Sequence, residues 1–330
     1  MSTSVAPAPP DAAGGAGGPG DGGVAADGTG RPPVVGRTVT WKELATSRGA
    51  LVAYAFIFPY VAFFLAFRIL PALYGVLLSF GDVSLAGRFR FVGLENFARL
   101  VQDDVFWHSL RVTTIYALLA IPLAVVLSLL MAQLCNRAMR GMSFYRSLFF
   151  LPVVTSPVIS GIIFVWMFSG GGPLDELLGS VGLELGNWLQ NEFLVLPALA
   201  LVAAWSSFGY NMLILLAGML AIPPDYYEAA ELDGASPWER FRYVTLPLLK
   251  PALFFVLVLE TVKSFQAFDT IYVMTGGGPA RGSYTLTFMI FDQGFGYFEF
   301  GYASAVGVVL LVITLILSLI QRRLMGRSES

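Results

Sequence analysis

The sequence has little charge, one cysteine and one histidine. Only 13% of its 330 residues are charged, against roughly a quarter in ordinary soluble domains. A lone cysteine, Cys135, excludes an internal disulfide, and together with His108 it cannot provide the several ligands of a structural metal site. The net charge of −2 gives no basic surface for nucleic acid. We expect Cys135 to be a small buried side chain and His108 an interfacial one, with no metal site and no nucleic-acid partner.

Motifs for chemistry are missing as well. The phosphate-binding pattern G-x-x-x-x-G-K-[ST] occurs nowhere in the chain. One histidine and one cysteine, without a recognisable nucleophile motif, cannot be assembled into a catalytic constellation. The sequence therefore predicts a protein that is not an enzyme, with no catalytic residues and no cofactor of its own.

Long apolar runs are what the chain has in abundance. A helix that rises 1.5 Å per residue needs about 20 apolar residues to cross a hydrocarbon core of about 30 Å. The short alternating segments of a membrane β-barrel are absent. The sequence therefore predicts an all-α polytopic membrane protein with about six transmembrane helices. These lie at about residues 50–80, 112–134, 147–168, 193–220, 251–274 and 301–320.

The sequence before the first apolar run has a different composition. Residues 1–49 are rich in Gly, Pro and Ala and have few large apolar side chains with which to offset the entropy of ordering. They also lack the basic region and compact apolar stretch of a cleavable signal peptide. We expect a disordered cytoplasmic tail at 1–49, a transmembrane domain at 50–323 and a short cytoplasmic tail at 324–330.

Lys and Arg are unequally divided between the two sides of the predicted bundle. Cytoplasmic loops carry an excess of these residues, and most of them fall in the two tails, between the second and third runs, and before the fifth. The loop at 169–192, on the other side, has none. We therefore expect both termini in the cytoplasm. The outer side would carry Arg88, Arg90, Arg99, Arg111 and Arg281.

A polar segment at residues 222–247 separates the fourth and fifth runs. Pro224 is placed for the first turn of a short helix, and Gly234 is placed where a left-handed helix terminus would end it. The residues SPWE at 236–239 have the capping-box pattern and predict an immediate second helix, which we expect to end at Pro247. From these residues alone, a membrane-interface turn with aromatic anchors is an equally good interpretation.

The polar segment also carries a family resemblance. The sequence EAAELDGA at 228–235, followed by an aliphatic-x-Leu-Pro that ends at Pro247, resembles the EAA loop of permease subunits of bacterial ATP-binding-cassette (ABC) importers. The resemblance extends over most of 50–323 and implies the type I importer permease fold in the bacterial cytoplasmic membrane. Further stretches resemble the subfamily that imports sugars and related polyols, namely FVGLENF at 91–97, SFYRSLFFLP at 143–152 and FDTIYVMTGGGP at 268–279.

In this family the loop docks as a coupling helix on a separate ATPase subunit. The resemblance therefore implies two ATPase subunits, which bind ATP and Mg²⁺, a second permease subunit in a heterodimer, and an extracytoplasmic solute-binding protein. Asp233 has an alternative role as a cap of its own helix. By position, the docking residues are Glu228, Ala229, Ala230, Asp233, Gly234 and Ala235.

The fifth apolar run contains ionisable residues, which usually face a cavity or a partner when they lie in a membrane. At 100° per residue Glu260, Lys263 and Ser264 share one helix face, with Asp269 opposite. Glu260 and Lys263 can pair at i, i+3 as an ion pair with a purely structural role. The other interpretation is that this face offers hydrogen bonds to a polyhydroxylated solute.

The fourth run adds a second polar patch. Trp205, Ser207, Tyr210, Glu260 and Ser264 fall on or beside positions that match sugar-contacting stretches of maltose-type permeases, although several identities differ from that pattern. Small hydroxyl residues are also common where membrane helices pack. The predicted solute path consists of Trp205, Ser207, Tyr210, Asn211, Glu260, Lys263, Ser264 and Gln266.

The combined prediction is the permease subunit of an ABC importer for a saccharide or related solute. One alternative is a permease of the same kind for a non-sugar solute such as a glycerophosphodiester. A second alternative is a secondary transporter, which would carry its own coupling-ion site. The charges of the fifth run are compatible with the secondary transporter, but the polar segment is not expected in one.

Overall fold

The computed structural model describes residues 48–83, 88–136, 140–183 and 185–325. Most of the two predicted tails lies outside the described residues. The chain divides into two units, residues 1–63 and 64–330. In the first unit the described part is most of helix α2 (Arg48–Phe64). The second unit contains the other elements, including every residue predicted for docking and for the solute path.

In the described residues the regular secondary structure is helical except for one small hairpin. By length and composition, five of the described helices can cross a membrane, and a bent pair makes six, in agreement with the predicted number. The five are Tyr54–Leu78, Asp104–Cys135, Pro157–Gly179, Val195–Leu220 and Phe300–Leu324. The bent pair is Pro237–Leu248 and Lys250–Phe265, whose axes differ by 69°.

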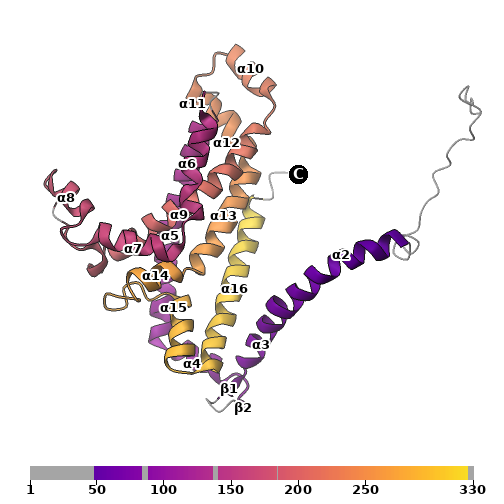
Figure 1. Ribbon diagram of the computed structural model, residues 1–330, viewed down its shortest axis with the longest axis vertical. Helices are drawn as coiled ribbons and strands as arrows, with labels where there is room; N and C mark the ends of the chain where they lie inside the picture. Colours follow the sequence, from indigo (N-terminus) through magenta and orange to yellow (C-terminus); the bar gives the residue numbers. More distant parts are fainter. Residues whose placement is uncertain (1–47, 84–87, 137–139, 184, 326–330) are drawn as a thin grey trace, which may run out of the picture. The chain divides into compact units, whose positions relative to one another are not determined.

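The core of the second unit is built around two long helices, α5 (Asp104–Cys135) and α9 (Val195–Leu220), which lie side by side. Their buried faces are rich in alanine, including the fully buried Ala124 and Ala198, and small residues allow membrane helices to approach closely. Helix α13 (Lys250–Phe265) packs against both of them, and α16 (Phe300–Met325) packs against α13 (Figure 1).

The third predicted helix, residues 147–168, is not continuous, and this prediction was wrong. The chain forms α6 (Met142–Val154), interrupts at residues 155–156, and resumes as α7 (Pro157–Phe168). Pro157 explains the break, because a proline disfavours helical geometry in the residue before it. Ser156 accordingly has an extended ψ of 134°. A further short helix, α8 (Pro173–Gly179), follows.

The fifth predicted helix, residues 251–274, is also interrupted. Helix α13 ends at Phe265, and α14 (Asp269–Met274) begins after three non-helical residues. Before α13, the second helix of the polar segment ends at Leu248, within one residue of the predicted end at Pro247. Helix α11 (Pro237–Arg240) runs through a π-helical turn, η3 (Phe241–Thr245), into α12 (Leu246–Leu248), and the direction changes only there.

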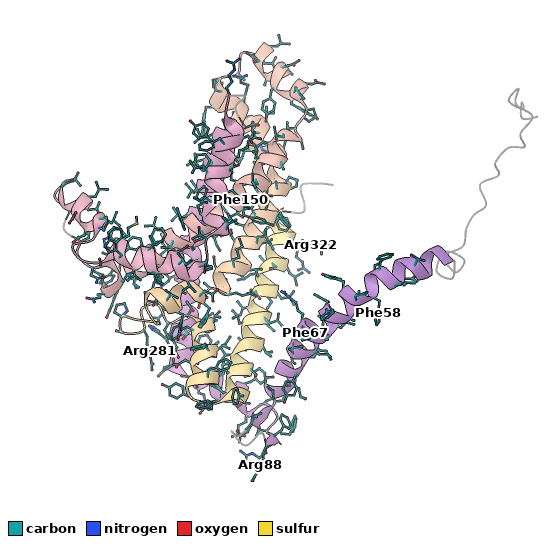
Figure 2. The ribbon with its side chains drawn as sticks, viewed as in Figure 1. Phe58, Phe67, Arg88, Phe150, Arg281 and Arg322 are labelled. Atoms are coloured by element: carbon teal, nitrogen blue, oxygen red, sulfur yellow. The ribbon has the colours of Figure 1, made fainter. Side chains whose placement is uncertain are left out.

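The chain between α14 and α16 folds back into the second unit. A loop at residues 275–285, from which Arg281 projects (Figure 2), leads to α15 (Leu286–Phe291) and the π-helical turn η4 (Asp292–Gly296). The hydroxyl of Thr113, on α5, accepts a hydrogen bond of 2.9 Å from the backbone N–H of Leu286. This contact ties the loop to α5, and no feature of the sequence predicted it.

The two ends of the second unit differ in composition. One end carries α10 (Pro224–Leu232) and α11, both from the polar segment, and the other carries α4 (Glu95–Gln102) and the hairpin of β1 (Gly81–Val83) and β2 (Phe89–Phe91) (Figure 1). In the hairpin Asp82 pairs with Arg90 in antiparallel register. At the same end, Tyr302 of α16 donates a 2.5 Å hydrogen bond to Asp103, the residue that caps α5.

Candidate functional site

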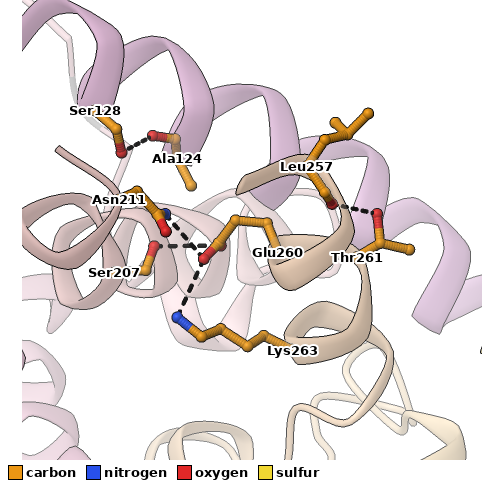
Figure 3. A network of polar contacts seen from close by, with 8 residues as sticks. All are labelled: Ala124, Ser128, Ser207, Asn211, Leu257, Glu260, Thr261 and Lys263. Carbon is orange, nitrogen blue, oxygen red and sulfur yellow. Dashed lines mark hydrogen bonds and ion pairs between the residues drawn. The ribbon is translucent and has the colours of Figure 1, made fainter. Parts of the chain in front are cut away.

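A buried carboxylate, Glu260, organises the polar residues of the predicted path. Its side chain is 4% exposed and lies on α13, facing α9. Ser207 Oγ donates to Oε2 at 3.3 Å, Asn211 Nδ2 donates to Oε1 at 3.0 Å, and Lys263 Nζ lies 3.3 Å from Oε1 (Figure 3). We call these four residues the Glu260 cluster. Burial of a carboxylate is costly unless it is paired and hydrogen-bonded, and the cluster meets both conditions.

The cluster retains hydrogen-bonding capacity of its own. Asn211 is fully buried, and its Oδ1 has no hydrogen-bond partner in the described part of the chain. The Lys263 side chain is 49% exposed, and its ammonium lies 5.3 Å from the centre of the Tyr210 ring. An ammonium has three donors, so Lys263 can bind Glu260 and still donate to another group.

A cavity of about 350 Å³ adjoins the cluster. It collects polar side chains from four separate elements, so it is formed by the tertiary fold and not by one helix face. The polar and ionisable side chains that line it are Tyr116 from α5, Ser206 and Ser207 from α9, Glu260, Lys263 and Ser264 from α13, Gln266 from the break after it, and Asp269 and Thr270 from α14.

The structure brings five of the eight predicted path residues to the cavity wall, namely Ser207, Glu260, Lys263, Ser264 and Gln266. The other three lie outside the lining. Trp205 instead packs edge-on against Phe164 of α7, with ring centres 5.1 Å apart. Asn211 lies behind Glu260 as its hydrogen-bond donor, and Tyr210 lies under the Lys263 ammonium.

Two lining residues differ from the sequence-based prediction. The placement of Asp269 opposite Glu260 assumed one continuous helix, and it was wrong because α13 ends at Phe265. Because of the break, Asp269 lies in the wall of the same cavity as Glu260. Tyr116 was missed altogether, since it lies in the second apolar run. The only available signal was a phenol within a mostly apolar run.

The polar segment has the local geometry that the sequence predicted. Helix α10 ends at Leu232, and Gly234 has a φ of +78°. Ala235 N–H donates to Ala230 O at 2.9 Å, which is the hydrogen bond of a Schellman terminus. The capping box is confirmed: Ser236 Oγ accepts from Glu239 N–H, and Glu239 Oε2 accepts from Ser236 N–H.

Two side-chain contacts join the helices of the polar segment, and neither was predicted. The hydroxyls of Tyr227 on α10 and Thr245 on η3 are 3.0 Å apart, and Thr245 is buried. Arg240 Nη1 forms an ion pair with Glu231 at 2.9 Å. The first contact is the stronger tie, because exposed ion pairs contribute little.

The predicted docking residues are accessible. Glu228, Ala229, Asp233 and Gly234 are exposed, and Ala230 and Ala235 are half-buried. Asp233 is the C-cap residue of α10, directly after Leu232, and its backbone N–H donates to Ala229 O. Sequence reasoning missed Leu232, which is 91% exposed.

Comparison with known proteins finds membrane components of transport systems. Residues 112–329 match the family model described as "Binding-protein-dependent transport system inner membrane component". The chain is 37% identical to the probable ABC transporter permease protein YesP of Bacillus subtilis, over 84% of this chain and 92% of that protein. It is 33% identical to the trehalose/maltose transport system permease protein MalF of Thermococcus litoralis, over 81% and 91%.

A third sequence relative and one solved structure are also similar to this chain. The sn-glycerol-3-phosphate transport system permease protein UgpA of Agrobacterium fabrum is 37% identical over 71% of this chain and 80% of that protein. Among solved structures, one similar chain belongs to a bacterial ABC transporter involved in the import of the acidic polysaccharide alginate. It superposes on this chain with a TM-score of 0.75 and is 22% identical, and the match covers 88% of this chain and 99% of that one. At that identity the superposition shows a shared fold.

Proposed function

Because the chain belongs to the family of binding-protein-dependent transport system inner membrane components, we propose that it forms half of the path by which an ABC importer moves a sugar or related polar solute. It is a multi-pass membrane protein and has no phosphate-binding loop in its sequence. In the proposed complex, ATP and Mg²⁺ bind to two separate ATPase subunits. A second, different permease subunit forms the other half of the path.

One structural observation carries the coupling part of the proposal. The Glu260 cluster joins α9 to α13, and these are the two helices that enter and leave the polar segment. Nine residues separate Asn211 from Leu220 and ten separate Lys250 from Glu260, so the cluster lies about 15 Å from the segment along each helix. A force applied to the polar segment therefore reaches the cavity wall through two rigid helices.

The cavity chemistry supports a neutral, polyhydroxylated solute. Its lining combines hydroxyl, amide and charged groups with the rings of Tyr116 and Phe268, which suits a ligand that has hydroxyl groups and apolar C–H faces. Two carboxylates, Glu260 and Asp269, outnumber the one ammonium of Lys263. This balance favours a saccharide over an anionic solute. Glycerol phosphate or a glycerophosphodiester is the second candidate, which Lys263 could bind through its exposed ammonium.

The proposed orientation places the polar segment and both termini in the cytoplasm of a bacterium. The Lys and Arg distribution supports this orientation. The end with α4 and the hairpin would then face outward, toward a solute-binding protein. On the cytoplasmic side the docking surface would consist of Glu228, Ala229, Ala230, Asp233, Gly234 and Ala235.

The substitution Gly234→Asp tests the coupling assignment. An added Cβ at Gly234 has no atom within 4 Å, and the left-handed φ of +78° costs a non-glycine residue roughly 1–2 kcal/mol, so the fold should survive while a carboxylate obstructs docking. Gly141→Asp is a matched control, since Gly141 has a similar φ of +84° and equally open space but lies outside the polar segment. We expect Gly234→Asp to abolish solute uptake and solute-stimulated ATP hydrolysis in proteoliposomes, and Gly141→Asp to retain both.

Each contrary outcome has a definite meaning. Full uptake by Gly234→Asp would contradict docking at this residue. Uptake by the purified chain alone, driven by an ion gradient without any ATPase subunit, would contradict the importer and support the secondary transporter instead.

A further inference from the structure

A second, more basic pocket lies toward the end of the second unit remote from the polar segment. It has a volume of about 440 Å³ and is lined by the first two turns of α5 and by the tip of the 275–285 loop. Arg111 and Arg281 contribute two positive charges and Asp104 one negative charge, a net charge of +1 with His108 neutral. We call it the outer pocket. Figure 2 shows Arg281 on its loop.

The loop holds Arg281 in a fixed and unfavourable backbone conformation. Ala280 and Arg281 have φ values of 45° and 65°, a left-handed geometry that costs roughly 1 kcal/mol or more for each non-glycine residue. Hydrogen bonds hold it there. His108 Nε2 lies 2.9 Å from Arg281 O, and Ser283 Oγ donates to Gly278 O at 2.6 Å. Strain of this kind persists only where surrounding contacts impose it, and it is concentrated at functional positions.

Further contacts stiffen the base of the loop. The hydroxyls of Thr275 and Ser283 are 2.7 Å apart, and Tyr284 donates a 2.6 Å hydrogen bond to Asp292. Burial and this hydrogen bond both raise the pKa of Tyr284 above its usual value. The Arg281 guanidinium is therefore presented by a pre-organised loop.

The outer pocket lies next to the solute cavity. Arg111 precedes Tyr116, a cavity residue, by five positions on α5, or about 7.5 Å along the helix. On the other wall, residues 266–270 line the cavity, and residues 280–281, ten positions further along the chain, line the outer pocket. A protein that delivers solute to the cavity from the outer side would pass over this pocket.

We propose that the outer pocket receives an acidic side chain of the solute-binding protein when that protein docks. The inference rests on the proposed function. A guanidinium forms strong, oriented pairs with a carboxylate, and complementary charge accelerates and orients the association of two proteins. Two arginines on separate, fixed elements define a position for that carboxylate directly outside the cavity.

The test uses the whole importer with the binding protein that stimulates its ATPase. The importer is reconstituted in nanodiscs of phosphatidylcholine, and ATP hydrolysis is measured against binding-protein concentration at low and high salt. Arg281→Gln and Arg111→Gln are compared with Arg90→Gln. Arg90 is a suitable control because it is 75% exposed, lies at the same end of the second unit, and is not part of the pocket.

We expect each pocket substitution to raise the binding-protein concentration needed for half-maximal ATPase activity by about tenfold at low salt, with the maximal rate unchanged. The difference from the unmodified importer should shrink at high salt, because screening weakens the lost interaction. Arg90→Gln should change the half-maximal concentration by less than twofold.

Three results would overturn the proposal. Pocket substitutions that behave like Arg90→Gln would show that the pocket takes no part in docking. A change in solute dependence at saturating binding protein would assign the pocket to the solute. An effect that appears only when phosphatidylglycerol is added would assign it to a lipid headgroup. An unmodified importer that no binding protein stimulates would instead contradict the proposed function.

Discussion

The polar segment and the Glu260 cluster are held together by different kinds of contact. In the polar segment the bonded side chains are close in sequence: Ser236 and Glu239 are 3 residues apart, and Tyr227 and Thr245 are 18 apart. In the cluster, Glu260 binds Lys263 on its own helix and also two side chains 49 and 53 residues away, on a different helix. The segment is mostly exposed, whereas Glu260, Ser207 and Asn211 are buried.

This difference predicts how each region responds to substitution. A helix cap contributes about 1 kcal/mol, and an exposed ion pair contributes up to about 1 kcal/mol. Hydrogen bonds to a charged group contribute about 1.5–3 kcal/mol, and leaving such groups buried without a partner adds a desolvation penalty. Removal of one cluster side chain should therefore have a larger effect than removal of one contact within the segment.

Among substitutions that remove a side-chain contact, the largest effect is expected for Glu260→Leu. This change removes the acceptor of three contacts and leaves Asn211 and Ser207 buried beside an apolar side chain. Loss of even one charge-assisted hydrogen bond, about 1.5–3 kcal/mol, corresponds to at least a tenfold fall in solute uptake. Uptake is measured in proteoliposomes against Glu192→Leu, which removes an exposed carboxylate. Equal uptake by the two variants would show that the cluster plays no part in transport.

A smaller effect, on stability, is expected from Gly209→Ala, which adds a side-chain carbon where α9 packs closely against α6. A Cβ added at Gly209, on α9, would overlap Phe149 O and lie 3.1 Å from the Cα of Phe150. Both obstructing atoms are backbone atoms of α6 and cannot move aside easily. Gly209→Ala should therefore destabilise the protein by about 1–3 kcal/mol, the usual cost of overpacking, measured as a lower unfolding temperature in detergent.

The matched control for Gly209 is Gly75 on α3 (Leu70–Leu78), where an added Cβ meets no atom within 4 Å. Gly75→Ala should leave stability unchanged or raise it by up to about 1 kcal/mol, because alanine has the higher helix propensity. If both substitutions lowered the unfolding temperature equally, the close approach of α9 and α6 would not be the cause.

The same contrast between local and distant contacts explains what the sequence could predict. The end of α10 at Gly234 and the capping box at 236–239 depend on neighbouring residues, so a short stretch of sequence is enough to predict them. The break before Pro157 also has a local signal in the proline itself. It was missed because residues 147–168 are mostly apolar, and an apolar run of that length favours one continuous helix.

Other features had no local signal. The break between Phe265 and Asp269 contains neither Gly nor Pro, yet the hydroxyls of Thr285 and Thr287 donate to the carbonyls of Ala267 and Phe265 from a distant element. Tertiary contacts thus replace the helical hydrogen bonds there. Tyr116 reaches the cavity only because α5 packs against α9, which no short sequence window contains.

The smallest expected effect tests a partly buried side-chain contact inside the polar segment. Tyr227→Phe removes a hydroxyl but keeps the ring, so α10 should dock normally while its link to Thr245 is lost. One such hydrogen bond is worth about 1 kcal/mol, or about a fivefold change in the ratio of solute moved to ATP hydrolysed. Tyr243→Phe is the control, since Tyr243 is exposed on the same segment.

A double-substitution cycle distinguishes a mechanical link from general loosening of the segment. If the Tyr227 and Thr245 hydroxyls act on each other, Tyr227→Phe and Thr245→Val together should lower the transport-to-hydrolysis ratio no further than either alone, because the second change removes a partner already lost. Additive losses would mean that the two hydroxyls act separately. In that case the force on the polar segment would reach α13 through the backbone of η3 and α12 alone.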